Sequence, residues 1–346
     1  MGESDHDLAR RLVREHGWNS TCTQTLNEGL SLWISSARDA VVAYVRRSGV
    51  AVVAGAPVCA EGRLPEVMAE FERAFTRVAY FGAEARVLHA AERRGGYERV
   101  ALGAQPIWSP ASWAVALRKD RSLRAQLARA RNKGVVVTER TSGTDPGLRR
   151  VLDQWLRSRR FPTLRFLVEP ETLDLDGDRR LFVAEREGRP VGFVVMAPVP
   201  QRDGWLTEMF VRGDDAPNGT VELTLDAAIA ASGGEYVTMG IVPLARQGGP
   251  TGGPNWLTPL IAWARAHGRR FYDFEGLEWF KAKFGPDRWE PVWLVSREEH
   301  LSLRTLIAVA EAFVHGPLLP AIVRGLIWSL RREWQNVSRN RRKRVR

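Results

Sequence analysis

The most informative stretch of the chain is residues 272–291, YDFEGLEWFKAKFGPDRWEP, which places Lys281 and Lys283 among aromatic side chains. The chain has only five lysines among its 51 basic residues, so two lysines this close together need a chemical reason. Lysine offers a compact ammonium that meets a phosphate as a point charge or changes its pKa on burial, whereas arginine keeps a flat, permanently charged fork. The stretch therefore indicates a site that uses lysine for its chemistry.

The aromatic neighbours of the two lysines indicate burial, and a buried ammonium needs a partner. The two side chains would share one face of an extended segment and point about 200° apart in a helix. Either a substrate phosphate or the carboxylates of the same stretch could serve as partners, namely Glu275, Glu278 and Glu290.

Length and charge limit what this stretch belongs to. At 346 residues, with 44% hydrophobic and 26% charged residues, the chain is typical of a globular protein with two domains. The net charge of +11 is concentrated at the end, because residues 331–346 hold eight basic residues against one glutamate. The rest of the chain is only weakly basic, so a protein that binds nucleic acid over its whole surface is not indicated.

The cysteines and the N-terminus indicate a reducing, cytoplasmic setting. Cys22 and Cys59 have neither metal-binding nor redox spacing. Residues 1–18 are polar, so no signal peptide is expected, and His6 stands where a myristoylation motif requires serine or threonine. The histidines are scattered and no nucleophile arrangement is visible, and without a cluster of ligands metal catalysis is not indicated.

The first half of the chain alternates helices and strands. The pattern predicts a polar helix at residues 7–16, paired strands at 40–45 and 50–54, a helix at 64–78 and a strand at 85–89. A basic helix at 120–132 ends at Gly134, and a strand follows from residue 135.

The second half repeats this style. Residues 181–185 and 191–197 read as a hairpin, and 205–211 as a third strand. Asn218 is expected to cap a helix that runs to about residue 231 and ends at Gly233, before a short strand at 236–239. Because strands, a helix and a further strand occur in both halves, the chain predicts two related α/β units in tandem, although no clear sequence repeat is visible.

The character changes from residue 301 onward. Residues 301–315 favour a helix packed on the catalytic body. Residues 322–346 carry an apolar face with Trp328 and Trp334 and a polybasic end, which is typical of a helix in the membrane interface. A solvated tail or a contact with RNA is the alternative. Pro317, Pro320 and charged residues interrupt the apolar stretch that starts at residue 301, so this stretch is too short to span a membrane.

Three further segments of the second half gather polar side chains. Strand alternation predicts Glu208 and Arg212 on one face, which is either a site or an exposed ion pair. In the turn at 214–222, the start of the following helix could seat a phosphate or an oxyanion, and Glu222 could hold a cationic amine. Ordinary helix capping is the alternative there. The glycine-rich loop at 248–253 lacks the geometry of the pyrophosphate loop of acetyltransferases, because Pro250 and Pro254 interrupt it.

The residues 271–294, together with 217–220 and 240–244, resemble the C-terminal catalytic domain of bacterial aminoacyl-phosphatidylglycerol synthases, the multiple peptide resistance factor family. The N-terminal half fits as well, so the resemblance covers roughly residues 8–296. It implies a mixed α/β fold of two tandem acetyltransferase-like (GNAT) units. The corresponding boundaries are residues 1–135, a catalytic unit at 136–300 and an amphipathic, polybasic tail at 301–346.

The resemblance also implies an activity. The family moves an amino acid from its tRNA ester to a hydroxyl of phosphatidylglycerol, without a cofactor, and so lowers the anionic charge that attracts cationic antimicrobial peptides. The implied partners are aminoacyl-tRNA, an anionic membrane contacted through the tail, and a separate membrane protein in place of the flippase half that family synthases usually carry. The implied location is the cytoplasmic face of the cell membrane.

The expected site residues come partly from the resemblance, by position, and partly from the segments described above. By position, Arg212 and Lys283 would hold phosphate or developing charge, Glu222 the aminoacyl amine, and Asn218 the turn at the site. Those expected in catalysis are Lys283, Arg212, Glu222 and Glu208. Those expected to bind substrate are Asn218, Gly219, Thr238, Gly240, Glu275, Lys281 and Arg288. Those expected to meet tRNA or headgroup phosphates are Arg129, Arg131 and Lys133.

Two departures from the family pattern bear on activity. Many members carry aspartate where this chain has Met209, and many read Gly-Asp-Pro where it has Gly55-Ala56-Pro57. The first departure leaves amino-acid choice and activity open. The alternatives are an acyl-CoA-dependent N-acetyltransferase, disfavoured by the missing pyrophosphate loop, and an inactive module that binds lipid or tRNA.

Overall fold

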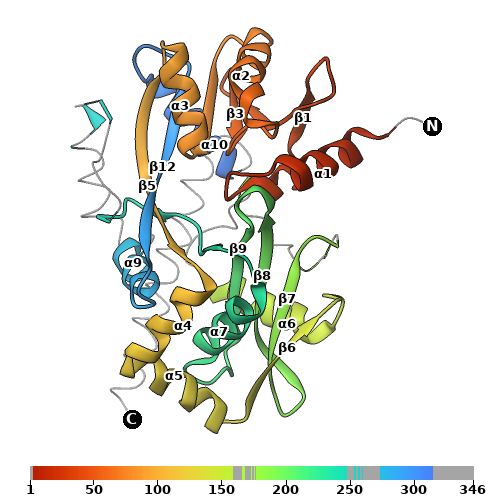
Figure 1. Cartoon of the computed structure of the whole chain (residues 1–346), viewed down its shortest axis with the longest axis vertical. Helices are drawn as coiled ribbons and strands as arrows, with labels where there is room; N and C mark the ends of the chain where they lie inside the picture. The colour runs from red at the N-terminus through yellow and green to blue at the C-terminus, as the bar shows by residue number, and fades with distance from the viewer. Residues whose placement is uncertain are drawn as a thin grey trace, which may run out of the picture.

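The computed structural model describes residues 3–158, 166–167, 173, 175, 177–247, 253–254, 256–257, 259 and 273–314. Within them one mixed sheet runs through the molecule in the order β1-β2-β3-β4-β12-β5-β10-β9-β8-β7-β6, and β11 pairs with β5 (Figure 1). The strands are β1 (Ser31–Ile34), β2 (Val41–Arg47), β3 (Val50–Ala54), β4 (Val78–Ala83), β5 (Glu98–Trp108), β6 (Val135–Arg140), β7 (Arg180–Arg186), β8 (Arg189–Val199), β9 (Gly204–Arg212), β10 (Tyr236–Thr238), β11 (Val242–Pro243) and β12 (Arg288–Ser296). The mixed α/β fold expected from the sequence is confirmed.

Helices lie on both faces of this sheet (Figure 1). The α-helices are α1 (Asp5–His16), α2 (Leu64–Arg73), α3 (Ala85–Arg94), α4 (Pro110–Lys119), α5 (Arg121–Asn132), α6 (Pro146–Ser158), α7 (Thr220–Ser232), α9 (Phe274–Ala282) and α10 (Leu303–Val314). The short 3₁₀ helices are η1 (Cys22–Leu26), η2 (Glu61–Arg63) and η3 (Pro200–Arg202).

The two halves share a local topology. In the first, β1, β2 and β3 form an antiparallel meander, and α2 leads into β4, which runs parallel to β3. In the second, β7, β8 and β9 form the meander, and α7 leads into β10, which runs parallel to β9. Each half thus contains a meander followed by a helix and a parallel strand.

The halves are joined within the sheet itself. β10 pairs with β9 on one side and with β5 of the first half on the other. β12, from the end of the predicted catalytic unit, lies between β4 and β5 of the first half. This pairing brings the stretch around Lys283 to the junction, where α9 directly precedes β12 (Figure 1).

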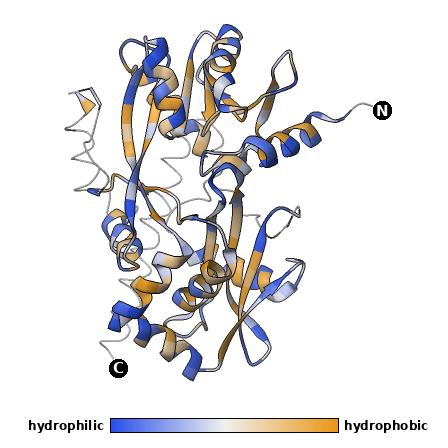
Figure 2. Cartoon of the chain, in the orientation of Figure 1, coloured by the Kyte–Doolittle hydropathy of each residue, from blue (hydrophilic) through white to orange (hydrophobic). Residues whose placement is uncertain are grey.

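Hydrophobic residues concentrate along the strands and on the inner faces of the helices (Figure 2). The core under α4, α5 and α7 is built on Trp108, Trp113, Leu127 and Phe284. Residues 301–315, expected as a helix on the catalytic body, contain α10, which packs through Ala308 and Ala312 on the core that includes β2 and β3 of the first half. Among the described residues no helix has the length and apolar character needed to cross a bilayer.

Three local predictions were wrong. Residues 85–89, expected as a strand, begin helix α3, because Val87, Ala90 and Ala91 repeat at helical spacing and are buried together. α2 ends at Arg73, and Val78 already belongs to β4. Gly219, not Asn218, is the N-cap residue of α7. The tail at 322–346 lies outside the described residues.

Candidate functional site

Lys283 and Glu222 form the centre of the candidate site. Lys283 is the residue at the end of α9, and its Nζ donates to Glu222 Oε1 on α7 at 2.5 Å and to Gln126 Oε1 on α5 at 3.4 Å. The two paired side chains are 12% and 13% exposed. A cation and an anion from distant parts of the chain thus meet in a mostly enclosed place.

Aromatic rings enclose the ammonium of Lys283. The Phe280 ring lies 4.3 Å from Nζ, within the range of a cation–π contact. Phe280 stacks on Phe210 of β9 with centroids 5.6 Å apart, and Phe284 stacks on Trp113 of α4 at 4.9 Å. These contacts hold the end of α9 against β9 and α4.

The start of α7 is shaped by Gly219. Its φ is 93°, and a Cβ at this position would lie 2.1 Å from the carbonyl oxygen of Gln126, so only glycine lets α7 approach α5 this closely. Glu222 stands in the first turn of α7, whose backbone N–H groups are not all used within the helix. Asn218 is exposed beside this turn.

Lys281 lies on the other side of α9, within the protein. It is 3% exposed, and its Nζ donates to the carbonyl oxygens of Met239, Gly240 and Ile241 at 2.6, 2.8 and 3.1 Å. Burial lowers the pKa of Lys281 to about 7. Since three acceptors occupy its three N–H bonds, Lys281 is a buried support, in contrast to the expectation that it binds substrate.

The predicted residues Thr238 and Gly240 belong to this same support. Thr238 is fully buried in β10, and its hydroxyl accepts from the N–H of Gly240 at 3.1 Å. Gly240 adopts a φ of 71°, which turns the chain after β10. Both residues shape the loop around Lys281.

Glu208 lies apart from the pair, contrary to the expectation that it joins the catalytic residues. A bulge in the β8–β9 pairing interrupts the strand alternation, because Val195 pairs with Met209 and Met196 with Thr207. Glu208 instead accepts from Arg179 Nε at 2.6 Å and from Gln24 Nε2 of η1 at 2.7 Å.

Arg212 lies at the end of β9 with an exposed side chain. It alternates with Phe210, so both lie on the face of β9 that α9 covers. Met209, which stands where many relatives carry aspartate, is buried among Leu148, Val151 and other residues on the opposite face. Arg212 therefore shares the face of Phe210, which stacks on α9, whereas Met209 lies on the opposite face.

The remaining predicted residues lie on the surface. Glu275 contacts Arg246 at 3.4 Å, and Arg288 contacts Glu290 at 2.8 Å. Arg131 of α5 contacts Asp226 of α7 at 3.4 Å, and Asp226 lies one helical turn after Glu222. Arg129 of α5 and Lys133, just after the end of that helix, are exposed. The basic surface of α5 thus adjoins the site through α7.

Sequence reasoning missed a buried polar junction between the halves. Residues 19–25, NSTCTQT, lie between α1 and β1, and nearly all of their side chains are buried. Arg202 of η3 completes the junction, because it contacts Glu84 and Glu290 at 2.6 Å each and stacks on Trp18 at 3.8 Å. The unbroken polar run after a helix was the available signal.

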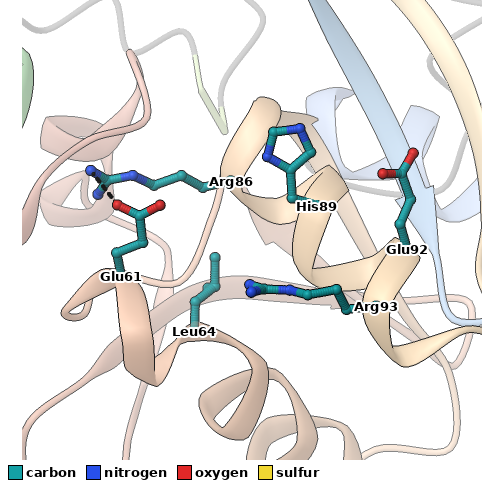
Figure 3. A pocket seen from close by; sticks show the side chains of 6 residues that line it. All are labelled: Glu61, Leu64, Arg86, His89, Glu92 and Arg93. Atoms are coloured by element: carbon teal, nitrogen blue, oxygen red, sulfur yellow. Dashed lines mark ion pairs between the residues drawn. The ribbon is translucent and has the colours of Figure 1, made fainter.

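A separate pocket of about 540 Å³ opens in the first half. Figure 3 shows Arg86 paired with Glu61, and Arg93 from α3 pointing toward Leu64. The pocket is also lined by His89 and Glu92, and it includes none of the predicted site residues.

The chemistry of the Lys283 site is that of paired charges beside aromatic rings. A ligand carrying both an ammonium and a phosphate or oxyanion can replace the internal pair with two external pairs, and neither charge is then left alone. In the described part of the chain no cluster of three or more histidine, cysteine or acidic residues could hold a metal ion.

Comparison with known proteins gives a family match. The model of the family described as phosphatidylglycerol lysyltransferase, C-terminal, matches residues 10–296. No curated protein matches the sequence.

Solved structures share the fold. The C-terminal domain of a proposed lysylphosphatidylglycerol synthetase from Agrobacterium fabrum is 19% identical, with a TM-score of 0.74 over 89% of this chain and 96% of that one. L-PGS from Bacillus licheniformis is 20% identical, with a TM-score of 0.71 over 94% and 97%. FemX is 11% identical, with a TM-score of 0.56 over 89% and 99%.

Proposed function

The chain belongs to the family of phosphatidylglycerol lysyltransferase C-terminal domains, and we propose that it is an aminoacyltransferase that uses aminoacyl-tRNA and a polar lipid such as phosphatidylglycerol. The reaction exchanges one ester for another. The lipid hydroxyl oxygen attacks the ester carbonyl carbon, the bond to the ribose oxygen breaks, and the hydroxyl proton ends on that ribose oxygen. No net oxidation occurs, so the reaction requires binding, orientation and charge stabilisation.

The observation that carries this proposal is the Lys283–Glu222 pair above Phe280. An aminoacyl ester presents an α-ammonium, which suits Glu222. The lipid phosphate, or the oxyanion formed during attack, suits the ammonium of Lys283. Each of the two groups has its counter-charge within the protein, and a bound substrate would exchange this internal pair for two pairs of its own.

Phosphates near the site have further candidate partners. Arg212 lies on the face of β9 that carries Phe210, and Arg129 on α5 and Lys133 just after it are exposed. An exposed row of cations attracts polyanions without reading sequence, and this attraction weakens with salt. We assign these residues to the phosphates of tRNA or of lipid headgroups.

The location proposed for the protein is the inner face of the cell membrane, with the polybasic end of the chain as the contact. Such a peripheral enzyme would reach lipid headgroups from the cytoplasm. The product carries less negative charge than its parent lipid and would reduce attraction of cationic peptides.

The test is an incubation of the full chain with each of the twenty aminoacyl-tRNAs and with liposomes of several headgroups, followed by mass spectrometry of the lipids. We expect an aminoacylated lipid with at least one tRNA. Omitting tRNA, or deacylating it first, should remove the product. Absence of any product from a folded, membrane-bound protein would leave the inactive binding module as the better description.

A further inference from the structure

The ammonium of Lys281 is held in an unusual way. Its three contacts come from the carbonyl oxygens of three consecutive residues, Met239, Gly240 and Ile241, at 2.6 to 3.1 Å. Lys281 is 3% exposed, and no carboxylate pairs with it among the described residues. A buried ammonium normally requires an anion as its partner. Here the dipoles of the three carbonyl groups stabilise the ammonium in place of a carboxylate.

The loop is built to point these carbonyls inward. Gly240 has a φ of 71°, and its N–H is held by the hydroxyl of Thr238. A Cβ on Gly240 would come within 3.3 Å of Leu206, so the turn lies close against β9. Carbonyl oxygens arranged around one point are how proteins replace the hydration shell of a monovalent cation.

This contact connects two parts of the candidate site. Lys281 belongs to the last turn of α9, and Lys283 stands two residues beyond it. The loop that holds Lys281 leaves β10, the strand that α7 leads into, and α7 carries Glu222. The distance between Lys283 and Glu222 is therefore fixed through the loop as well as through the aromatic stacking of Phe280.

We propose that Lys281 is a positioning residue whose ammonium, held by the carbonyls of residues 239–241, sets the end of α9 so that Lys283 meets Glu222. Removal of its side chain leaves a carbonyl-lined space that a small alkylammonium ion fills. The catalytic part of this inference rests on the proposed aminoacyl transfer, whereas the cation-binding part does not.

The first experiment uses the full chain with Lys281→Ala. Transfer should fall about 100-fold through kcat, with KM for either substrate changed less than about threefold, because misplacement by about 1 Å has this effect. Methylammonium or propylammonium should restore about tenfold, while tetramethylammonium and 1-propanol at equal ionic strength should restore nothing. Equal rescue by 1-propanol would show that Lys281 only fills space.

The second readout needs no catalysis. Propylammonium should raise the thermal midpoint of Lys281→Ala and leave that of Lys119→Ala unchanged, because Lys119 is an exposed lysine at the end of α4. If the wild-type protein shows no transfer but propylammonium raises the thermal midpoint of Lys281→Ala alone, the proposed function fails. The binding of a cation by the carbonyls of residues 239–241 would still be supported. If propylammonium does not raise the thermal midpoint of a folded Lys281→Ala variant, the proposal that these carbonyls bind a cation is wrong.

A third variant covers the case in which Lys281→Ala does not fold. Lys281→Met keeps most of the volume but leaves the three carbonyls without donors. Its crystal structure should show Lys283 Nζ moved from the 2.5 Å contact with Glu222. An unchanged Lys283–Glu222 contact together with wild-type kcat would refute the positioning role.

Discussion

At the scale of single residues, the enclosed contact between Lys283 and Glu222 leads to a prediction about coupling. Lys283→Ala should lower transfer by at least about 100-fold, because it removes the cation nearest the developing charge. Glu222→Gln should also lower it, and the double variant should lose less than the sum. We expect a coupling free energy of about 1–3 kcal/mol from a double-mutant cycle on kcat/KM.

The folding of these variants provides the control. Both side chains are mostly enclosed, and each single variant leaves one charge without its partner, so circular dichroism should show a folded protein while the thermal midpoint falls moderately below that of the wild type. Strictly additive losses in kcat/KM would show that the two residues act independently, and the paired-charge description of the site would then be wrong.

The two lysines show how far sequence reasoning reached. Side chains two positions apart in a helix point about 200° apart, so the sequence predicts nearly opposite directions for the two lysines if the segment is helical. The segment is helical in the structure, and Lys281 points into the loop after β10 whereas Lys283 points toward Glu222. The carbonyl partners of Lys281 are some forty residues away and form no pattern with it, so no local signal could name them.

At the scale of elements, the start of α7 depends on one glycine. Gly219→Ala should destabilise the protein by about 3 kcal/mol or more, because the left-handed φ of 93° is strained for alanine and the new Cβ would overlap the Gln126 carbonyl. Relief of the overlap would move α7 from α5, so transfer should fall as well. Denaturant unfolding and kcat measure the two effects.

The opposite end of α7 supplies the matched control. Gly233 also has a positive φ, 67°, but nothing lies within 4 Å of a Cβ built there. Gly233→Ala should therefore cost about 1–3 kcal/mol from backbone strain alone, with no overlap added, and leave transfer unchanged. Equal effects at the two ends would mean that the close approach of α5 and α7 is not what the glycine protects.

Elements were predicted best where hydrophobic spacing was unambiguous. The hairpin of β7 and β8 and the helix α5 follow the sequence pattern closely. Residues 85–89 failed because a short apolar run fits either a strand or a buried helix turn. Glu208 failed for another reason, since a bulge in β9 changes which side chains share a face, and a bulge leaves little trace in local composition.

At the scale of the whole molecule, Arg202 joins the halves. Arg202→Met should destabilise the protein by about 3–5 kcal/mol, because it leaves Glu84, 2% exposed, without its cationic partner. The matched control is Arg180→Met, which breaks the more exposed pair with Glu139 and should cost less than about 1 kcal/mol. Urea unfolding followed by tryptophan fluorescence and circular dichroism measures both losses.

The loss at Arg202 should depend on pH. Burial raises the pKa of Glu84 and Arg202 opposes that rise, so the variant leaves burial unopposed. A carboxyl with a folded pKa above its unfolded value binds a proton more readily in the folded protein. The stability gap between variant and wild type should therefore shrink as pH falls from 8 toward 5, and a gap that widens on acidification would contradict this account.

Removal of the C-terminal tail tests whether this polybasic segment holds the molecule at a membrane. Truncation after Gly316 keeps α10 and removes the polybasic segment, so the body should stay folded while binding to liposomes weakens at least tenfold. The lost binding should be the salt-sensitive part, because surface potentials are screened within about 8 Å at physiological ionic strength. Sedimentation with phosphatidylglycerol liposomes between low and high salt measures it, and neutral liposomes serve as the control. If the truncated protein sediments as well as the full chain at low salt, the body itself provides the contact. The exposed cations of α5 and its C-terminal end would then be the next surface to change, since Arg129 and Lys133 lie on, and just after, the helix that packs beside α7.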